Sequence, residues 1–225
     1  MKKTITLLLA TAGFAAAATD PLEITWTDNE ATLSEALDAI SVVFTLDFES
    51  LGTNRPLDKE VYTTIFSWSG TTEEGSENGG VKHYFFLDDT YSGDYYNELQ
   101  FSAPSNSKFS RDKVEGYVKA IIGYTYSVNE TACRYLTLID ANGNPIDKGI
   151  VSGTRTRDSL SITVLSKHAA VGNIEVYGSV LSADEMAAAM TNLANPAPTP
   201  SVPEPTTATL SLLALAGLAA RRRRR

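Results

Sequence analysis

Short stretches in which apolar and polar residues alternate recur along residues 20–195, and they limit the possible fold more than any other feature. Such alternation places the apolar side chains on one face of a half-buried β-strand. Turn-forming residues separate the stretches, and no regular alternation of strands with helices suggests a parallel sheet. The sequence therefore predicts an all-β fold, a sandwich or barrel. The expected strands are Leu22–Thr27, Ser41–Phe48, Val61–Ser69, Val81–Leu87, Tyr95–Phe101, Val114–Val128, Arg134–Ile139, Ser159–Leu165 and Asn173–Tyr177.

Three connections between these strands have recognisable sequences. Residues Thr32–Ile40 are expected to form a short helix, with Thr32 or Ser34 as its N-cap. Residues Gly70–Gly80 are polar and rich in glycine, which is typical of a loop. The dipeptide at 142–143 is Asn-Gly, a strong signal for a hairpin turn.

A capping box predicts one helix at the end of the domain. The Ser182 hydroxyl is placed to accept from the Glu185 amide, while the Glu185 side chain reaches back towards Ser182. Leu181 and Met186 stand at the positions of a hydrophobic staple. The helix is expected to run to about Leu193, before a linker at 196–201 that is rich in proline.

The N-terminus has the three parts of a secretory signal peptide. Met1-Lys2-Lys3 is a positive start, residues 5–18 are apolar and rich in alanine, and Ala16-Ala17-Ala18 offers small residues for cleavage. Residues 1–18 are therefore expected to be removed, leaving residues 20–195 as one exported domain.

The C-terminus carries a rigid polar segment, an apolar run and a basic end. The apolar run Thr206–Ala220 has 15 residues. As a helix it would span about 22 Å, short of the ~30 Å hydrocarbon core, so it is a marginal transmembrane segment. The positive-inside rule keeps the basic end in the cytoplasm. The two polar parts are Val202, Pro203, Glu204 and Pro205, and Arg221, Arg222, Arg223, Arg224 and Arg225.

This order of segments resembles the PEP-CTERM sorting signal of Gram-negative bacteria. The resemblance implies an exosortase, a membrane enzyme, as processing partner. It also implies a chain anchored in the inner membrane before processing and located in the cell envelope, outer surface or extracellular matrix afterwards. A simple C-terminal membrane anchor is the alternative, and the Pro-Glu-Pro tripeptide at 203–205 favours sorting.

The exported domain is strongly acidic. The formal net charge of −8 includes seven basic residues at the two ends, namely Lys2, Lys3 and Arg221–Arg225. Without them and without Glu204, the net charge is −14. A surface this acidic disfavours nucleic acid and anionic lipid as partners. Cys133 is the only cysteine, so the domain has no internal disulfide.

The segment Gly172–Met186 resembles the closing segment of LamG-like domains, a last strand followed by a short helix. The expected hairpin around Leu136–Ile146 lies where those domains carry a similar turn. The resemblance implies a concanavalin A-like jelly roll, in which two antiparallel sheets pack face to face, a fold that includes lectins. It also implies a structural Ca²⁺ held by loop oxygens. The candidate ligands are Asp88, Asp89 and Asp94, or Asp140, Asn142 and Asn144.

Catalysis has little support in the sequence. Some jelly rolls are glucanases, which need two carboxylates on either side of the scissile bond. Glu175 stands alone on its strand, and the adjacent Asp88 and Asp89 would point to opposite faces of a strand. The chain is therefore expected not to be an enzyme, with an unrecognised glycosidase as an alternative.

Tyrosines gather around the expected turn at 88–94. Tyr91, Tyr95 and Tyr96 are candidate sugar-contacting residues, although strand-core positions would also explain them. The leading hypothesis is an exported, non-catalytic surface protein that binds carbohydrate, exopolysaccharide or another envelope polymer. The other is a purely structural or adhesive envelope protein with no small ligand.

Overall fold

The structure, a computed structural model, describes residues 20–51, 61–73, 75–88, 94–102, 111–127, 131–154 and 159–194. Within these ranges the strands form two antiparallel sheets. The six-stranded sheet has the order β1 (Glu30–Leu37), β10 (Ser161–Lys167), β3 (Val61–Thr72), β4 (Gly75–Asp88), β5 (Asp94–Ser102) and β6 (Arg111–Lys113). The five-stranded sheet has the order β11 (Val171–Tyr177), β2 (Ala39–Asp47), β7 (Tyr117–Ser127), β8 (Thr131–Asp140) and β9 (Pro145–Thr154).

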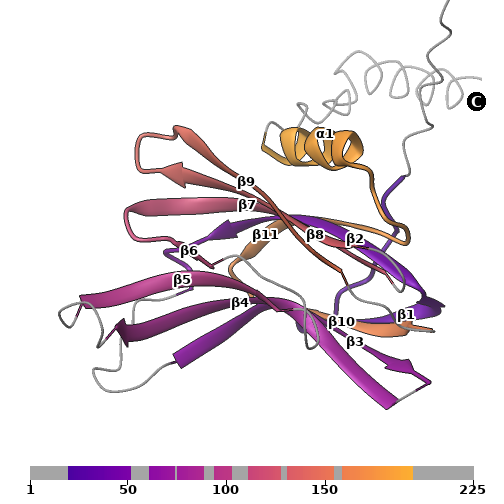
Figure 1. Cartoon of the computed structure of the whole chain (residues 1–225). Helices are drawn as coiled ribbons and strands as arrows, with labels where there is room; N and C mark the ends of the chain where they lie inside the picture. Colours follow the sequence, from indigo (N-terminus) through magenta and orange to yellow (C-terminus); the bar gives the residue numbers. More distant parts are fainter. Residues whose placement is uncertain are drawn as a thin grey trace, which may run out of the picture. The chain divides into compact units, whose positions relative to one another are not determined.

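The two sheets pack face to face as a jelly-roll sandwich, which confirms the predicted fold class (Figure 1). Alternate residues of facing strands fill the space between the sheets, as period-two alternation requires. The largest fully buried side chains in this core include Trp68, Tyr124, Tyr126, Phe44 and Phe66.

The helix α1 (Ala183–Ala194) lies on the outer face of the five-stranded sheet, where it packs on β2 and β7 (Figure 1). The capping box is present as predicted. The Glu185 amide donates to Ser182 Oγ at 3.3 Å, and the Ser182 amide donates to Glu185 Oε2 at 2.8 Å. The staple residues Leu181 and Met186 are both buried in the small core beneath the helix.

The expected strand at Leu22–Thr27 is wrong. The Leu22 amide donates to the Val176 carbonyl at 2.7 Å, but the segment forms no strand. It ends in a tight turn, where Asp28 and Asn29 have positive φ angles of 49° and 66°. Two consecutive residues of this kind are typical of a hairpin turn. The turn leads directly into β1.

The expected helix at Thr32–Ile40 is also wrong, because residues 30–37 form β1 and β2 begins at Ala39. An isolated helix of nine residues is marginal in water, so its propensity is easily overridden. In the fold, Ala31 is buried in the main core, and β1 pairs with β10 through Ala31 and Leu165. Pairing at the sheet edge determines the structure of this segment.

The expected loop at Gly70–Gly80 is largely a β-hairpin. Strand β3 continues to Thr72 and β4 begins at Gly75. The glycines mark crowded positions. A Cβ on Gly70 would lie 2.5 Å from the Ser161 carbonyl oxygen, and one on Gly79 would lie 2.5 Å from the Trp68 indole. Close packing therefore requires glycine at these two positions, and the glycines do not interrupt the pairing of β3 with β4.

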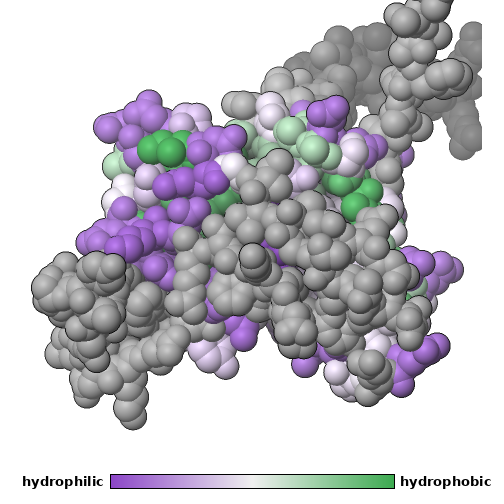
Figure 2. All heavy atoms as spheres, in the orientation of Figure 1, coloured by the Kyte–Doolittle hydropathy of each residue, from purple (hydrophilic) through white to green (hydrophobic). Residues whose placement is uncertain are grey.

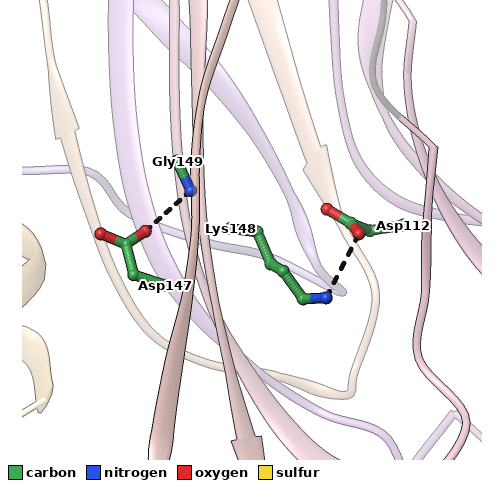
Figure 3. Close-up of polar contacts among 4 residues, drawn as sticks. All are labelled: Asp112, Asp147, Lys148 and Gly149. Carbon is green, nitrogen blue, oxygen red and sulfur yellow. Dashed lines mark hydrogen bonds and ion pairs between the residues drawn. The ribbon is translucent and has the colours of Figure 1, made fainter.

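The hairpin turn at 142–143 is confirmed. The Gly143 amide donates to the Asp140 carbonyl at 3.0 Å, and Gly143 has a positive φ of 83°. The turn joins β8 to β9, the edge strand of its sheet. At this edge, Lys148 Nζ on β9 lies 3.6 Å from Asp112 Oδ1 on β6, so an ion pair links the two sheets (Figure 3).

On the face seen in Figure 2, the coloured residues are mostly hydrophilic, and hydrophobic residues form small separate patches. Four large hydrophobic side chains are exposed among the described residues: Leu22, Tyr62, Val118 and Ile146. Tyr62 is the most exposed of them, at 56 %, and it lies beside the candidate site described next.

Candidate functional site

A hollow of about 350 Å³ lies on the six-stranded sheet, on strands β1, β10, β3 and β4. We call it the sheet hollow. Small and polar residues dominate its lining, and most of them occupy outward-facing positions of their strands; Trp68 and its strand partner Gly79 belong to the inner face. The lining residues are Glu30, Thr64, Ser67, Trp68, Ser69, Asn78, Gly79, Gly80, Lys82, Val164 and Ser166.

Strand register brings these residues together in rows. One row crosses four strands through Glu30, Ser166, Ser67 and Gly80. A row of this length covers about 14 Å, since adjacent strands lie about 4.8 Å apart. Ser166, Ser67 and Gly80 of this row have short side chains, so the row forms the floor.

Most of the side chains in the rows on either side of the floor are larger than those of the floor. Val164, Ser69 and Asn78 are aligned across β10, β3 and β4 on one side. On the other side, Thr64 of β3 is paired with Lys82 of β4. The result is a trough that runs across the strands.

A β-bulge in β3 makes the floor possible. The register shifts between Thr64 and Phe66, so that Ile65 and Phe66 are both buried. The extra residue places Thr64 and Ser67 on the same outer face although they are three positions apart. Gly80 is also required, because a Cβ there would lie only 2.1 Å from the Phe66 carbonyl oxygen.

An aromatic ring flanks the trough. Tyr62 lies two residues before Thr64 on β3, and Lys82 Nζ lies 4.6 Å from the centroid of its ring. This distance is within the range of a cation–π contact, which holds the ring and the ammonium together. The trough thus offers hydroxyl and amide groups on its floor and walls, with an exposed aromatic side chain beside one wall.

The lining contains one acidic side chain, Glu30, and one basic side chain, Lys82. Among the residues that the structure describes, no other charged side chain lines the hollow. The arrangement therefore suits hydrogen bonding to a polar ligand combined with stacking on Tyr62.

The predicted sugar-contacting tyrosines are not part of this lining. Tyr91 lies outside the described residues. Tyr95 and Tyr96 lie on β5, paired with Leu87 and Phe86, and the structure does not describe their side chains. Their proposed role stays a prediction.

The first predicted calcium set lies at the same end of the β4–β5 pair. Asp88 and Asp94 are partners at the end of the ladder, without described side chains, and Asp89 lies outside the described residues. No group of three metal-binding side chains occurs among the residues that the structure describes. This set therefore also stays a prediction.

The second predicted calcium set forms a turn. Asp140 Oδ1 accepts from the amides of Asn142 at 2.9 Å and Asn144 at 2.8 Å, while Oδ2 accepts from the Asn144 side chain at 3.0 Å. These hydrogen bonds, above all the one from the Asn144 side chain, lower the pKa of the Asp140 carboxyl. The mutual hydrogen bonds of the turn are enough to explain why Asp140, Asn142 and Asn144 occur at these positions.

Glu175, the carboxylate that stands alone on its strand in the sequence, has a hydrogen-bonding neighbour on that strand. The Tyr177 hydroxyl donates to Glu175 Oε2 at 2.7 Å. Burial and this carboxylate raise the pKa of Tyr177 above its usual value. Glu175 thus serves as acceptor for a tyrosine that packs beneath α1.

The sheet hollow was missed from sequence because one of its strands was assigned partly to a loop. Ser67 and Ser69 fall within an expected strand, but Asn78, Gly79 and Gly80 fall within the expected loop at 70–80. The alternation of Ser67 and Ser69 with the buried Phe66 and Trp68 was the available signal for an outward polar face.

The end of the chain carries a known family motif. Residues 201–225 match the family model of the PEP-CTERM protein-sorting motif. The match confirms the sorting signal expected from the sequence. The motif supports export of this chain, anchoring in the membrane before processing, and processing by an exosortase.

The other comparisons add little. No curated protein matches the sequence. One solved structure, described as a functionally unknown protein from Saccharomyces cerevisiae, is 11 % identical. The similarity covers 70 % of this chain and 89 % of that one, with a TM-score of 0.30. The resemblance of residues 172–186 to LamG-like domains stays a prediction, because the matched family model covers the tail alone.

Across the described ranges, no helix has the length and apolar character needed to span a bilayer. The expected membrane segment at 206–220 lies outside those ranges, as do the signal peptide and the residues of the sorting signal.

Proposed function

We propose that this is an exported, non-catalytic surface protein that binds carbohydrate or a related envelope polymer in the sheet hollow. The observation that carries the proposal is the row of short polar side chains, Ser166 and Ser67, flanked by hydrogen-bonding walls and by Tyr62. Ligand sites in proteins commonly combine a concave surface, an aromatic side chain and a few well-placed polar groups.

The chemistry of the lining fits a sugar. Thr64, Ser67, Ser69 and Ser166 carry hydroxyl groups that both donate and accept, and Asn78 adds an amide that does the same. Sugar hydroxyls need partners of this kind. The flat face of a pyranose ring is apolar, so an exposed ring such as Tyr62 would stack on it.

The shape of the hollow fits a polymer. The floor row extends about 14 Å across the strands, which would hold several linked sugar units in an extended chain. A polymer could extend along the trough beyond the site. A site built for a small ligand would instead enclose that ligand on all sides.

A binding role without catalysis is supported by the charges in the hollow. Glycoside hydrolysis normally requires two carboxyl groups, about 5–9 Å apart, on either side of the bond. Within the described part of the chain, Glu30 is the single carboxylate of the lining, and it lies at the end of the floor row on the edge strand β1.

The location fits such a role. The sorting motif sends the chain to the membrane for processing by an exosortase. After processing, the domain would reside in the envelope or the surrounding exopolysaccharide, where polymeric sugars are abundant. The acidic surface would keep it soluble there.

A glycan array tests the proposal. The full chain in detergent micelles is expected to bind one class of polysaccharide fragment, and Tyr62→Ala should weaken that binding at least tenfold. Ile146→Ala is the control, since Ile146 is also an exposed hydrophobic residue but lies on β9, outside the hollow. Parallel arrays with calcium and with chelator would test whether glycan binding depends on the predicted Ca²⁺.

Silence across the array would contradict the proposal and favour a purely structural envelope protein. Cleavage of any bound glycan by the wild-type chain would contradict the non-catalytic assignment.

A further inference from the structure

We propose that a second hollow, at the edge of the sandwich, binds a short peptide segment of another envelope protein that carries both basic and apolar side chains. We call it the edge hollow. It has a volume of about 350 Å³ and lies between residues 22–25 and strand β1. Its lining residues are Leu22, Glu23, Ile24, Thr25, Thr32, Leu33, Ser34, Glu35 and Leu37.

The register of β1 creates this hollow. From Thr32 to Leu37, β1 advances five residues, while its partner β10 advances only two, from Val164 to Ile162. The extra residues of β1 therefore leave the regular ladder. Residues 22–25 lie beside this irregular segment, and the space between the two forms the hollow.

The hollow has an apolar part that contacts the core. Ile24, Leu33 and Leu37 are partly buried and pack against the main hydrophobic core. Leu22 remains 39 % exposed and is one of four large exposed hydrophobic side chains among the described residues. Gly178 sits beneath the two leucines, since a Cβ there would lie 3.2 Å from Leu37 and 3.6 Å from Leu22.

The polar part of the hollow is acidic. Glu23 and Glu35 line it, and both are exposed. No basic side chain of the described ranges lines it. The excess of acidic residues extends along the sequence: residues 20–54 contain eight carboxylates and no lysine, arginine or histidine. Lys167 is a nearby cation outside the lining, and its ammonium lies 5.5 Å from the ring of Trp26.

Charge complementarity selects the occupant. Two carboxylates beside an exposed leucine and a partly buried apolar floor favour a ligand with positive charges around apolar side chains. Anionic polymers would be repelled. An extended peptide also suits the position, because β1 is an edge strand, and edge strands recognise peptides through main-chain hydrogen bonds. This inference concerns a different surface from the sheet hollow and does not depend on it.

The probe for the test is a five-residue peptide that alternates lysine and leucine. The full chain is held in nanodiscs of neutral lipid on a biosensor, with empty nanodiscs in the reference channel to remove binding of the peptide to lipid. We expect saturable binding to the wild-type chain. The double variant Glu23→Gln, Glu35→Gln should weaken it roughly tenfold, since it removes both carboxylates of the lining.

A control double variant at two other carboxylates distinguishes binding in the edge hollow from general attraction of a basic peptide to an acidic protein. Glu73→Gln with Glu115→Gln removes two exposed carboxylates outside the edge hollow and should change binding less than twofold. Leu22→Asn should weaken binding at least threefold while leaving the carboxylates in place.

Three results would overturn the inference: equal losses in the two double variants, equal binding of a peptide that alternates glutamate and leucine, or no binding at all. Glycan binding is measured on the same variants. Since the sheet hollow is elsewhere, failure of the peptide site with intact glycan binding would leave the proposed function standing, and the reverse also holds.

Discussion

The indole nitrogen of Trp68 lies 3.3 Å from the hydroxyl oxygen of Tyr124, so that a hydrogen bond joins β3 of one sheet to β7 of the other. Both side chains are fully buried, and the Trp68 ring lies 4.8 Å from the ring of Tyr126. Ser67 and Ser69, on either side of Trp68, line the sheet hollow. The inner face of β3 therefore holds in place the strand whose outer face forms the floor of the candidate site.

Tyr124→Phe is expected to lower the free energy of unfolding by about 1–3 kcal/mol, because the buried indole N–H loses its acceptor. Urea unfolding followed by circular dichroism measures the change. Tyr117→Phe is the control. Tyr117 is only partly buried, and its contact with Lys148 is with the ring, which phenylalanine retains. Equal losses in the two variants would contradict the assigned role of the hydrogen bond.

Gly79→Ala and Gly123→Ala should differ although both glycines lie in strands beneath large side chains. A Cβ on Gly79 would meet the rigid Trp68 indole at 2.5 Å, whereas one on Gly123 would meet the Met186 sulfur at 2.6 Å. The methionine is flexible and can move, so Gly123→Ala should cost less than Gly79→Ala, for which overpacking predicts about 1–3 kcal/mol or more. Thermal unfolding of both variants tests this order, and the reverse order would contradict it.

The strands were predictable from sequence where alternation and β-branched residues coincide, as in β2 and β7. The errors have two physical causes. Residues 32–37 have the local composition of a helix, but their pairing with β10 at the sheet edge overrides it. Residues 70–80 have the composition of a loop, but their glycines are placed there by the closeness of Ser161 and Trp68. Both causes are tertiary contacts, which a single sequence does not display.

The cap of α1 should make stability depend on pH. Hydrogen bonds from the Ser182 side chain and amide lower the pKa of Glu185 below its usual 4.5. A carboxyl with a lowered folded-state pKa stabilises the fold above its unfolded pKa, and this contribution is lost as the pH falls through the folded value. Ser182→Ala removes the N-cap hydroxyl, and loss of such a cap typically costs about 1 kcal/mol at neutral pH.

The cost of Ser182→Ala should shrink as the pH falls below 4.5, the usual pKa of this carboxyl. Thermal unfolding of both chains between pH 3 and pH 7 provides the measurement. Glu185→Gln, which cannot ionise at this position, is the control background. In that background, the stability cost of Ser182→Ala should not change between pH 7 and pH 3. If the stability cost of Ser182→Ala is the same at every pH, the ionised Glu185 carboxylate does not contribute to the cap.

Replacement of Pro203, Glu204 and Pro205 by alanine should block processing of the exported chain. Proline disfavours helix at its own position and at the residue before it, and alanine removes this preference. Mass spectrometry of the exported protein distinguishes a processed from an intact C-terminus. Thr199→Ala, outside the matched residues 201–225, should be processed normally. Normal processing of the triple variant would contradict the role of these three residues.

The site was harder to predict than the fold. The sorting motif is local in sequence and was found directly, whereas the sheet hollow joins residues of four strands. Glu30 and Lys82 line one hollow although 52 positions separate them in sequence. Only strand order and register bring such residues together, and the bulge after Thr64 adds a shift that alternation alone does not predict.

Chemical-shift mapping tests the central claim most directly. The ligand is the polysaccharide fragment that binds most strongly on the array, titrated into the isotope-labelled chain. Binding in the sheet hollow predicts the largest amide shifts at Thr64, Ser67, Asn78 and Ser166, and their loss in Tyr62→Ala. Shifts confined to residues 88–96, at the other candidate sugar site, or to the edge hollow would contradict the assignment of the polymer to the outer face of the six-stranded sheet.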